Sequence, residues 1–453
     1  MELSAGDTAW VLTSTALVLL MTPGLAFFYG GMTRAKSTLN MMMMSFAAIG
    51  IVTVLWVVYG YSLAFGDSGS ALYGAFDLSG LGSAVNELTN NGGIYGIPLL
   101  AFAGFQLMFA VITAALISGA IADRAKFLTW GIFVALWVTL VYFPVAHWVF
   151  DFGTKDADGA ITGAGWLAER GVEDFAGGTA VHINAGAAGL ALAIVLGRRL
   201  DFKKKAMRPH NLPLVLLGAG LLWFGWFGFN AGSALGASAQ AALVLLNTQA
   251  ATAAAMGGWL LVEKVRDGHA TSLGAASGAV AGLVAITPAC AFVAPWAAVV
   301  LGLVAGVVCS LAVGLKYRFN YDDSLDVVGV HLVGGLVGCL AIGFFGTTYT
   351  TGSGDSAFTW GVKGLFYGGG WELLGKQALG AFSVLAYSLV VTLILGYLLE
   401  KTLGFRVSRD QELEGIDVSE HAESAYELDG VSGGAYGDAM AMATRKSVLE
   451  ESA

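Results

Sequence analysis

The chain has 453 residues, of which 56% are hydrophobic and only 12% are charged, and its formal net charge at pH 7 is −9. Charged residues normally make up about a quarter of a soluble protein, so this chain has too few of them to cover the surface of soluble domains. The negative balance also excludes the basic footprint of a nucleic-acid-binding protein. We therefore expect a protein that crosses a lipid bilayer several times.

Eleven apolar runs are long enough to cross the bilayer as helices, which takes about 17 to 25 residues. The first run is too long for the core of a signal peptide, so we expect it to remain in the protein as a span. The predicted spans cover residues 8–32, 40–65, 98–122, 127–150, 176–197, 212–232, 239–262, 273–291, 296–315, 326–348 and 377–402. The sequence therefore predicts an all-α, multi-spanning membrane protein.

Basic residues between the spans indicate the orientation, because basic loops stay on the cytoplasmic side. Of the 23 Lys and Arg residues, all but Lys155, Arg170, Lys363 and Lys376 lie on one side of the predicted membrane. This pattern places the N-terminus outside and the C-terminus inside, which requires an odd number of spans. We expect a transmembrane domain over residues 1–403 and an acidic cytoplasmic tail over residues 404–453 that is disordered after Asp429.

The fifth and tenth predicted spans share the pattern H-x₃-G-x₂-G. The two copies are His182, Gly186 and Gly189, and His331, Gly335 and Gly338. The fifth span enters from outside and the tenth from inside, so spans 1–5 and 6–10 are expected to form inverted repeats. In such folds the transport site lies near the middle of the membrane, between the two halves.

His182 and His331 are candidate pore residues because ionisable side chains inside a membrane are costly and often functional. A neutral imidazole donates from one nitrogen and accepts at the other, so two facing histidines can satisfy each other without water. The alternative is that each histidine bonds a nearby backbone carbonyl.

Two aspartates precede these histidines and are expected to cap the helices that carry them. Asp174 lies eight residues before His182, and Asp326 lies five residues before His331. An Asp before a helical run typically accepts hydrogen bonds from the first backbone N–H groups. A second interpretation of Asp174 is a carboxylate that stabilises a cation near the mouth of a pore.

Aromatic side chains gather in the third and sixth predicted spans. They are Phe105 and Phe109, which flank Gln106, and Trp226 and Phe229, which precede Ser233 in GWFGFNAGS. Aromatic faces attract cations, and stacked phenyl rings can close a narrow path to water. Periodicity alone favours core or lipid-facing aromatics over a cation path.

Several long segments carry a family resemblance. They are TALVLLMTPGLAFFYGGM (15–32), DFAGGTAVHINAG (174–186), GWFGFNAGS (225–233), ATAAAMGGWL (251–260), SGAVAGLVAITPAC (277–290) and DVVGVH (326–331). Together they resemble the ammonium transporter family, and its bacterial branch in particular, over essentially the whole chain. The resemblance implies a homotrimer with one pore per subunit and with ammonium or ammonia as its substrate. The sequence shows no outer-membrane strand pattern and no organelle signal, so we expect the plasma membrane of a bacterium or archaeon.

The resemblance also implies roles for individual residues. By it, His182 and His331 are the twin histidines of a hydrophobic conduction path, and Phe109 and Phe229 are the stacked gate above them. The external ammonium site would consist of Ser233, Phe109 and Phe150 with Asp174 behind them, and Phe105, Gln106 and Trp226 would lie beside the gate.

One departure from the bacterial pattern falls at the outer site. The family places a Trp shortly after an Ala-His pair, whereas the segment AHWVF puts Phe150 there. Phe has a weaker negative face than Trp, so we expect weaker capture of external cations unless Trp148 or Trp166 substitutes. An insertion rich in Asp and Gly then separates this segment from Asp174.

The tail segment GFRVSRDQELEGIDVSEHAESAYE (404–427) resembles the cytoplasmic segment that docks PII signalling proteins. It is too charged to cross the membrane, so we expect a solvated tail that binds a partner.

These observations predict a transporter that captures NH₄⁺ outside, removes its proton and conducts NH₃ past the histidines, while the route of the proton stays open. The leading alternative is an ammonium sensor with little flux. A metalloenzyme is disfavoured because no H-E-x-x-H motif is present and the three Cys lie in apolar runs, so no cofactor or metal is expected. A coupled symporter would need more carboxylates within the spans.

Overall fold

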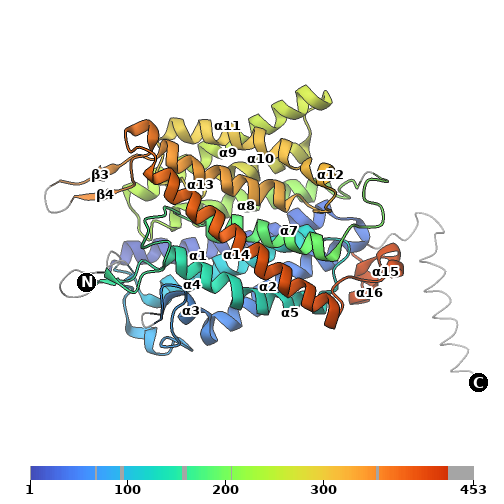
Figure 1. The fold of residues 1–453 in the computed structure, drawn as a ribbon, viewed down its shortest axis with the longest axis horizontal. Coiled ribbons are helices and arrows are strands. Elements are labelled where there is room, and N and C mark those ends of the chain that lie inside the picture. The colour runs from blue at the N-terminus through green and yellow to red at the C-terminus, as the bar shows by residue number, and fades with distance from the viewer. Residues whose placement is uncertain are drawn as a thin grey trace, which may run out of the picture.

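The computed structural model describes residues 2–66, 69–91, 96–155, 161–205, 207–353 and 357–426. Most of these residues form long helices that run side by side (Figure 1). The two β-hairpins, β1 (Thr154–Lys155) with β2 (Ile161–Thr162) and β3 (Tyr349–Thr351) with β4 (Phe358–Trp360), are antiparallel. In Figure 1 the β3–β4 hairpin projects from one end of the bundle, and the C-terminal helices lie at the other.

Apolar runs become helices here because the hydrocarbon core offers no partner for backbone polar groups, and a helix bonds these groups within one segment. The α-helices are α1 (Ala5–Met32), α2 (Thr38–Leu55), α3 (Tyr61–Phe65), α4 (Leu99–Ile117), α5 (Phe127–Trp137), α6 (Phe143–Phe150), α7 (Asn184–Leu196), α8 (Leu212–Gly232), α9 (Ala239–Asp267), α10 (Ser272–Ile286), α11 (Pro295–Ala312), α12 (Leu315–Phe319), α13 (Val333–Phe345), α14 (Glu372–Thr402), α15 (Arg409–Glu414) and α16 (Ile416–His421). Four π-helical segments interrupt or precede them, η2 (Trp56–Gly60), η5 (Val138–Tyr142), η6 (Gly178–Ile183) and η7 (Val328–Leu332), and the 3₁₀ turns are η1 (Ala35–Ser37), η3 (Ser83–Asn86), η4 (Ser118–Ile121) and η9 (Leu365–Tyr367).

Among the described residues, nine helical segments are long and apolar enough to cross a membrane. This confirms a helical, multi-pass membrane protein. The predicted spans 239–262 and 273–291 correspond to α9 and α10, which are not among the nine. Helix α10 has only 15 residues, and α9 includes the buried polar residues Gln240, Asn247 and Thr248. The count of eleven spans and the orientation therefore stay predictions.

The two segments that carry the repeated pattern pack against each other in a reciprocal way. A Cβ atom on Gly186 would lie 2.5 Å from the backbone nitrogen of Leu332, the residue after His331. A Cβ atom on Gly335 would lie 2.9 Å from a side-chain carbon of Ile183, the residue after His182. Equivalent residues thus make equivalent contacts, as expected for two segments related by a local twofold axis.

Aspartates cap both of these segments, but one of them is not the residue that the sequence indicated. The carboxylate of Asp174 accepts hydrogen bonds from the backbone of Gly177, Gly178 and Thr179 at the start of η6. At η7 the corresponding cap is Asp323, which accepts from Val327 and Val328. The prediction of Asp326 as this cap is therefore wrong.

Asp326 forms an ion pair instead of capping η7. Its backbone has a positive φ of 65°, and its carboxylate lies 2.6 Å from the Nζ atom of Lys316. The side chain therefore turns away from the first N–H groups of η7. The true cap, Asp323, lies eight residues before His331, the same interval that separates Asp174 from His182.

A buried ion cluster holds together the end of the bundle where the basic residues gather. Arg199 donates hydrogen bonds to Asp322 at 2.8 Å and to Asp123 at 3.0 Å. Burial alone would raise the pKa of Asp322, but the hydrogen bonds from Arg199 together with the charges of Arg124 and Arg199 hold this pKa below its usual range. Because breaking a buried pair leaves an uncompensated charge, this cluster firmly links the loop after α7, the turn between η4 and α5, and the loop before η7.

The described part of the acidic tail packs against the same end of the bundle. Glu412 and Asp417 are almost fully buried, and so are Phe405 and Ile416. The expectation of a solvated tail is therefore wrong for Glu412 and Asp417, because their carboxylates accept hydrogen bonds from backbone N–H groups of the bundle. Residues 427–453 of the predicted tail lie outside the described residues.

Candidate functional site

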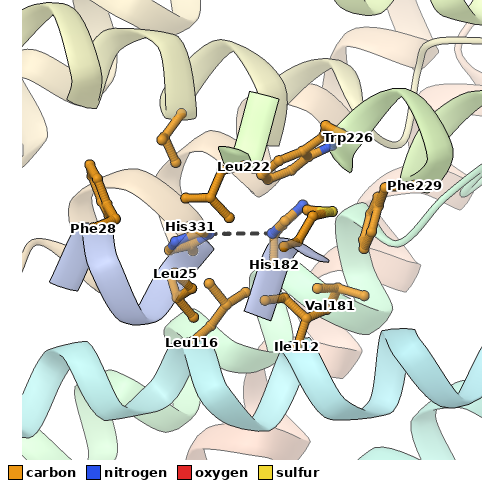
Figure 2. Close-up of a pocket in the computed structure, with 12 residues that line it drawn as sticks. Leu25, Phe28, Ile112, Leu116, Val181, His182, Leu222, Trp226, Phe229 and His331 are labelled. Atoms are coloured by element: carbon orange, nitrogen blue, oxygen red, sulfur yellow. Dashed lines mark hydrogen bonds between the residues drawn. The ribbon is translucent and has the colours of Figure 1, made fainter. Parts of the chain in front are cut away.

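The two histidines of the repeated pattern face each other inside the bundle. The Nδ1 atoms of His182 and His331 are 3.3 Å apart, and the two rings are nearly parallel with their centroids 5.4 Å apart. Both side chains are almost completely buried. Figure 2 shows the contact between the two rings, with apolar side chains on every side.

This contact fixes how the remaining ring nitrogens can act. One Nδ1 must donate a proton and the other must accept it, because two protonated or two bare nitrogens would repel each other. The Nε2 atom is then an acceptor on one histidine and a donor on the other. The Nε2 atom of His182 is buried and has no hydrogen-bond partner in the described protein, so it is available to a small polar molecule.

The space around the pair is narrow and dry. It leaves about 10 Å³ for the centre of a water-sized molecule, which is roughly the room that one water needs. Its walls, apart from the histidines, are the apolar or aromatic residues Met21, Leu25, Phe28, Ile112, Leu116, Val181, Leu222, Trp226, Phe229 and Val280 (Figure 2). Such a path admits a small neutral molecule and offers a bare cation no replacement for its water shell.

Aromatic rings close one end of this cavity. Phe109 and Phe229 are stacked with their centroids 4.2 Å apart, and Phe229 lies 6.1 Å from the ring of His182. Trp226 stacks on His182 at 5.4 Å, and its indole N–H donates to Thr287 at 2.9 Å. The structure thus brings the predicted gate and the histidines into one continuous cluster.

The residues predicted for the outer site lie on the other side of this stack. The ring of Phe150 is 6.4 Å from that of Phe109 in an edge-on arrangement. The hydroxyl of Ser233 donates to the backbone oxygen of Phe229 at 2.8 Å, which leaves the lone pairs of the hydroxyl oxygen free to accept. Ser233 is half-buried, so this oxygen remains reachable.

Asp174 acts on this site through the backbone. Besides its backbone partners, it accepts a hydrogen bond from the hydroxyl of Thr179. Burial raises the pKa of Asp174, and the hydrogen bonds from Thr179 and from the glycine N–H groups oppose the rise. These contacts hold the start of η6, and therefore the ring of His182, in place.

The remaining predicted residues have smaller roles in this arrangement. Phe105 packs edge-on against Phe109 at 5.0 Å, whereas Gln106 is half-buried and does not line the cavity. Trp148 donates its indole N–H to the backbone oxygen of Leu72 and lies 5.6 Å from Trp166. Trp148 and Trp166 therefore pack against each other beside the loop that contains Leu72. Phe150, and neither tryptophan, lies beside Phe109.

Sequence reasoning missed the apolar wall below the gate. Leu25 and Phe28 on α1 and Leu222 on α8 surround His331 in Figure 2. Nothing distinguishes these residues from the many other apolar residues of the spans. The missed aspartate, Asp323, did have a signal, because the interval of eight residues from Asp to His is the same in both copies.

The described residues contain no group of three or more His, Cys, Asp or Glu side chains that could hold a metal ion. His147, which lies near the predicted outer side, contacts the backbone oxygens of Ala64 and Ser70 and the carboxylate of Asp151. These contacts anchor a loop, which is the bland role that a buried histidine commonly has.

Comparisons with known proteins point to one family over nearly the full length of the chain. The family model described as Ammonium Transporter Family matches residues 9–426. An ammonium transporter of Mycobacterium tuberculosis is 57% identical over 444 residues, which cover 94% of this chain and 91% of that protein. The crystal structure of Saccharomyces cerevisiae Mep2 is 32% identical, covers 95% of this chain and 93% of its own, and superposes with a TM-score of 0.81. A structure described as a Sensor Amt Protein gives 30% identity and a TM-score of 0.81 over 92% of this chain and 98% of its own.

Proposed function

The chain belongs to the ammonium transporter family, whose members are transporters rather than enzymes, and we propose that it conducts ammonia past His182 and His331. The observation that carries this proposal is the pair of facing imidazoles in a cavity with room for about one small molecule. A free Nε2 atom on each ring lets the pair hold one molecule of ammonia by one hydrogen bond at a time.

Selection between NH₄⁺ and K⁺ follows from the chemistry of the two ions. They carry the same charge, but only NH₄⁺ donates hydrogen bonds and can lose a proton. We propose that NH₄⁺ is captured where the hydroxyl oxygen of Ser233 and the rings of Phe109 and Phe150 meet, and that it transfers its proton to water there before NH₃ enters the stacked gate. K⁺ is refused because the dry path beyond Phe229 cannot replace its water.

Asp174 supports this site indirectly in the proposal. Its carboxylate is occupied by backbone N–H groups and the hydroxyl of Thr179. It therefore positions η6 and adds a negative potential behind the outer site, rather than binding the cation itself.

The arrangement in the membrane is part of the same proposal. The end that carries Arg199 and the C-terminal helices faces the cytoplasm of a bacterium or archaeon, because the basic loops gather there. Residues 1–403 are the transport domain and residues 404–453 are a regulatory tail. By likeness to the family, three copies form a homotrimer with one pore each, and a PII-type signalling protein docks at residues 404–427.

The first test is the current evoked by an ammonium pulse on reconstituted proteoliposomes, with K⁺ as the control ion. We expect an ammonium signal that saturates, no signal with K⁺, and loss of either flux or selectivity in His331→Ala. Unchanged uptake together with unchanged K⁺ exclusion in this variant would overturn the role of the histidines. A current means that charge crosses, whereas a rise of internal pH without a current means that ammonia crosses alone.

The likeness to a sensor protein makes that alternative testable in the same experiment. The fold does not separate the two functions, since both kinds of structure superpose equally well. A sensor would bind ammonium and show neither a current nor a pH change faster than in empty liposomes. An ammonium signal from the reconstituted protein would favour the transporter.

A further inference from the structure

A second, much larger cavity follows the histidine cavity toward the basic end of the bundle. Leu25 and Phe28 on α1 line the first cavity, and Met32, one turn further along, lines the second. Likewise His331 lines the first, and Leu325 just before η7 lines the second. The second cavity therefore lies where a molecule leaving the histidines would emerge.

This exit cavity is open and strongly basic. It leaves about 470 Å³ for the centres of water-sized molecules. The charged residues in its wall are Arg199, Lys203, Lys204, Lys205, Lys316 and Asp326, which are five bases and one acid. A cavity of one charge sign with partly apolar walls concentrates ions of the opposite sign.

Two of the five bases are already neutralised by partners. Arg199 binds the buried carboxylates of Asp123 and Asp322, and Lys316 pairs with Asp326. Within the described part of the chain, the other three have no ion-pair partner, and the ammonium of Lys203 lies 5.8 Å from the centroid of the Phe202 ring.

The three remaining lysines are consecutive, exposed, and free of ion pairs with any described residue. The residue before them, Phe202, holds their loop in place by packing against the bundle. The ring of Phe202 is almost fully buried and stacks on Tyr317 of α12 at 5.7 Å, with an angle of only 10° between the rings. Phe202 and Tyr317 both line the cavity, so this stack fixes the lysines at its rim. Figure 1 shows α12 at the end of the bundle from which this loop extends.

We propose that Lys203, Lys204 and Lys205 form a binding site for a phosphoryl-bearing anion, and that the bound anion stands in the exit of the pore. Lys binds phosphate as a point charge, and three unpaired ammonium groups at one cavity attract the negatively charged oxygens of such a group. A soluble phosphate compound and the headgroup of an anionic phospholipid share this chemistry. The effect on conduction rests on the proposed function, whereas the binding does not.

Binding is measured with purified protein in nanodiscs of neutral phosphatidylcholine, with radiolabelled pyrophosphate as the probe. We expect that K203Q/K204Q/K205Q weakens binding by roughly tenfold or more, and that added salt weakens binding to the unaltered protein. The matched control R198Q/R208Q/K264Q removes three bases from the same face at positions that do not line the cavity. This control is expected to bind within about twofold of the unaltered protein.

The source of the phosphoryl group is found by adding phosphatidylglycerol to the nanodiscs. Loss of pyrophosphate binding, with more phosphatidylglycerol retained by the unaltered protein than by the lysine variant, identifies a lipid headgroup. Unchanged pyrophosphate binding identifies a soluble ligand. Equal weakening in the lysine variant and the control, or no retention of either probe, would overturn the site and leave the lysines only their role in orienting the chain.

The closing role is tested with proteoliposomes loaded with pyrophosphate. We expect lower ammonium flux through the unaltered protein and no change through the lysine variant. Binding without any effect on flux would overturn the closing role alone. If neither protein conducts while binding persists, the proposed transport function has failed and the anion site has not.

Discussion

Gly186 lies so close to Leu332 that a Cβ atom on residue 186 would be 2.5 Å from the backbone nitrogen of residue 332. This contact joins the helix after His182 to the segment that carries His331. The distance between the two imidazoles therefore depends on a residue that has no side chain. Glycine is needed at this position for close approach rather than for an unusual φ angle.

Gly186→Ala should consequently spread the two segments. The new methyl group would meet backbone that cannot turn away, so we expect a loss of about 1 to 3 kcal/mol in stability and a large fall in ammonium flux. Thermal unfolding in detergent and the proteoliposome assay measure the two effects. Gly220→Ala on α8 is the control, since a Cβ atom there meets nothing within 4 Å. Equal stability and flux in both variants would contradict the role of Gly186.

Phe150→Trp should strengthen the capture of external ammonium. Phe150 is buried and stands edge-on to Phe109, and an indole face attracts a cation more strongly than a phenyl face. A gain of about 0.5 kcal/mol would lower the half-saturating ammonium concentration by roughly twofold.

Phe152→Trp provides the matched control for this substitution. Phe152 lies two residues away and is 42% exposed, so a ring there is not part of the aromatic cluster. We expect its half-saturating concentration to stay unchanged. An unchanged or higher concentration in Phe150→Trp would contradict the proposal that the aromatic face of residue 150 attracts the cation.

Asp323→Asn should destabilise the protein more than Asp326→Asn. Asp323 is 1% exposed and caps η7 through two backbone N–H groups, whereas the side chain of Asp326 is 36% exposed. Loss of a cap costs about 0.5 to 2 kcal/mol. Because η7 carries His331, we also expect lower flux in Asp323→Asn. The reverse order of stability in thermal unfolding would restore Asp326 as the cap.

Much of the fold follows from the sequence because the bilayer leaves apolar runs no alternative to the helix. All eleven predicted runs contain helical segments of the structure. The π-helical segments η6 and η7 could not be predicted, because their extra residue per turn depends on the packing of the two repeats. The boundary of α10 was also missed, since the chain leaves the helix at Thr287 and continues through apolar residues to Val293.

The candidate site was predictable only where a residue type is unusual in a membrane. His182 and His331 could be paired because imidazoles are rare there and because the spacing of glycines around them repeats. Phe28 and Leu222 could not be identified as pore residues, because a sequence does not distinguish apolar residues that line a pore from apolar residues that face lipid. The tail was misread for a related reason. Acidic residues are usually solvated, and nothing in the sequence shows that Asp417 meets the free N–H groups of α2.

Glu173 should make stability depend on pH. Burial raises its pKa to about 7, although the charge of Lys376 acts in the opposite direction. Below the unfolded pKa of 4.5 both states hold the proton and nothing is lost. As the pH rises from there to 7, the unfolded chain releases the proton before the folded protein does, so folding becomes less favourable.

Glu173→Gln should remove this loss of folding stability at higher pH. We expect a gain of about 1 to 2 kcal/mol at pH 8 and almost none at pH 4.5, seen as a higher melting temperature in detergent. Glu169→Gln is the control, because Glu169 is an exposed carboxylate in the same loop. The same gain at both pH values would mean that the effect is not due to the charge of Glu173.

The C-terminal helices should detach when two carboxylates are neutralised. Asp417 accepts from the backbone N–H groups of Leu39 and Asn40 at the start of α2, and Glu420 accepts from that of Phe127 at the start of α5. Each bond involves a charged acceptor, which is worth about 1.5 to 3 kcal/mol. We therefore expect D417N/E420Q to increase hydrogen exchange in residues 409–421 by at least roughly tenfold.

Exchange at the start of α2 and α5 distinguishes a docked tail from one that merely lies nearby. Neutralising the carboxylates weakens the hydrogen bonds from the N–H groups of Leu39, Asn40 and Phe127, so these amides should exchange faster as well. Asp410→Asn is the control, because Asp410 is exposed on α15 and should leave both regions protected. Unchanged exchange in the tail, or faster exchange there without any change at Leu39, Asn40 and Phe127, would mean that the bonds to Asp417 and Glu420 do not couple the tail to the starts of α2 and α5.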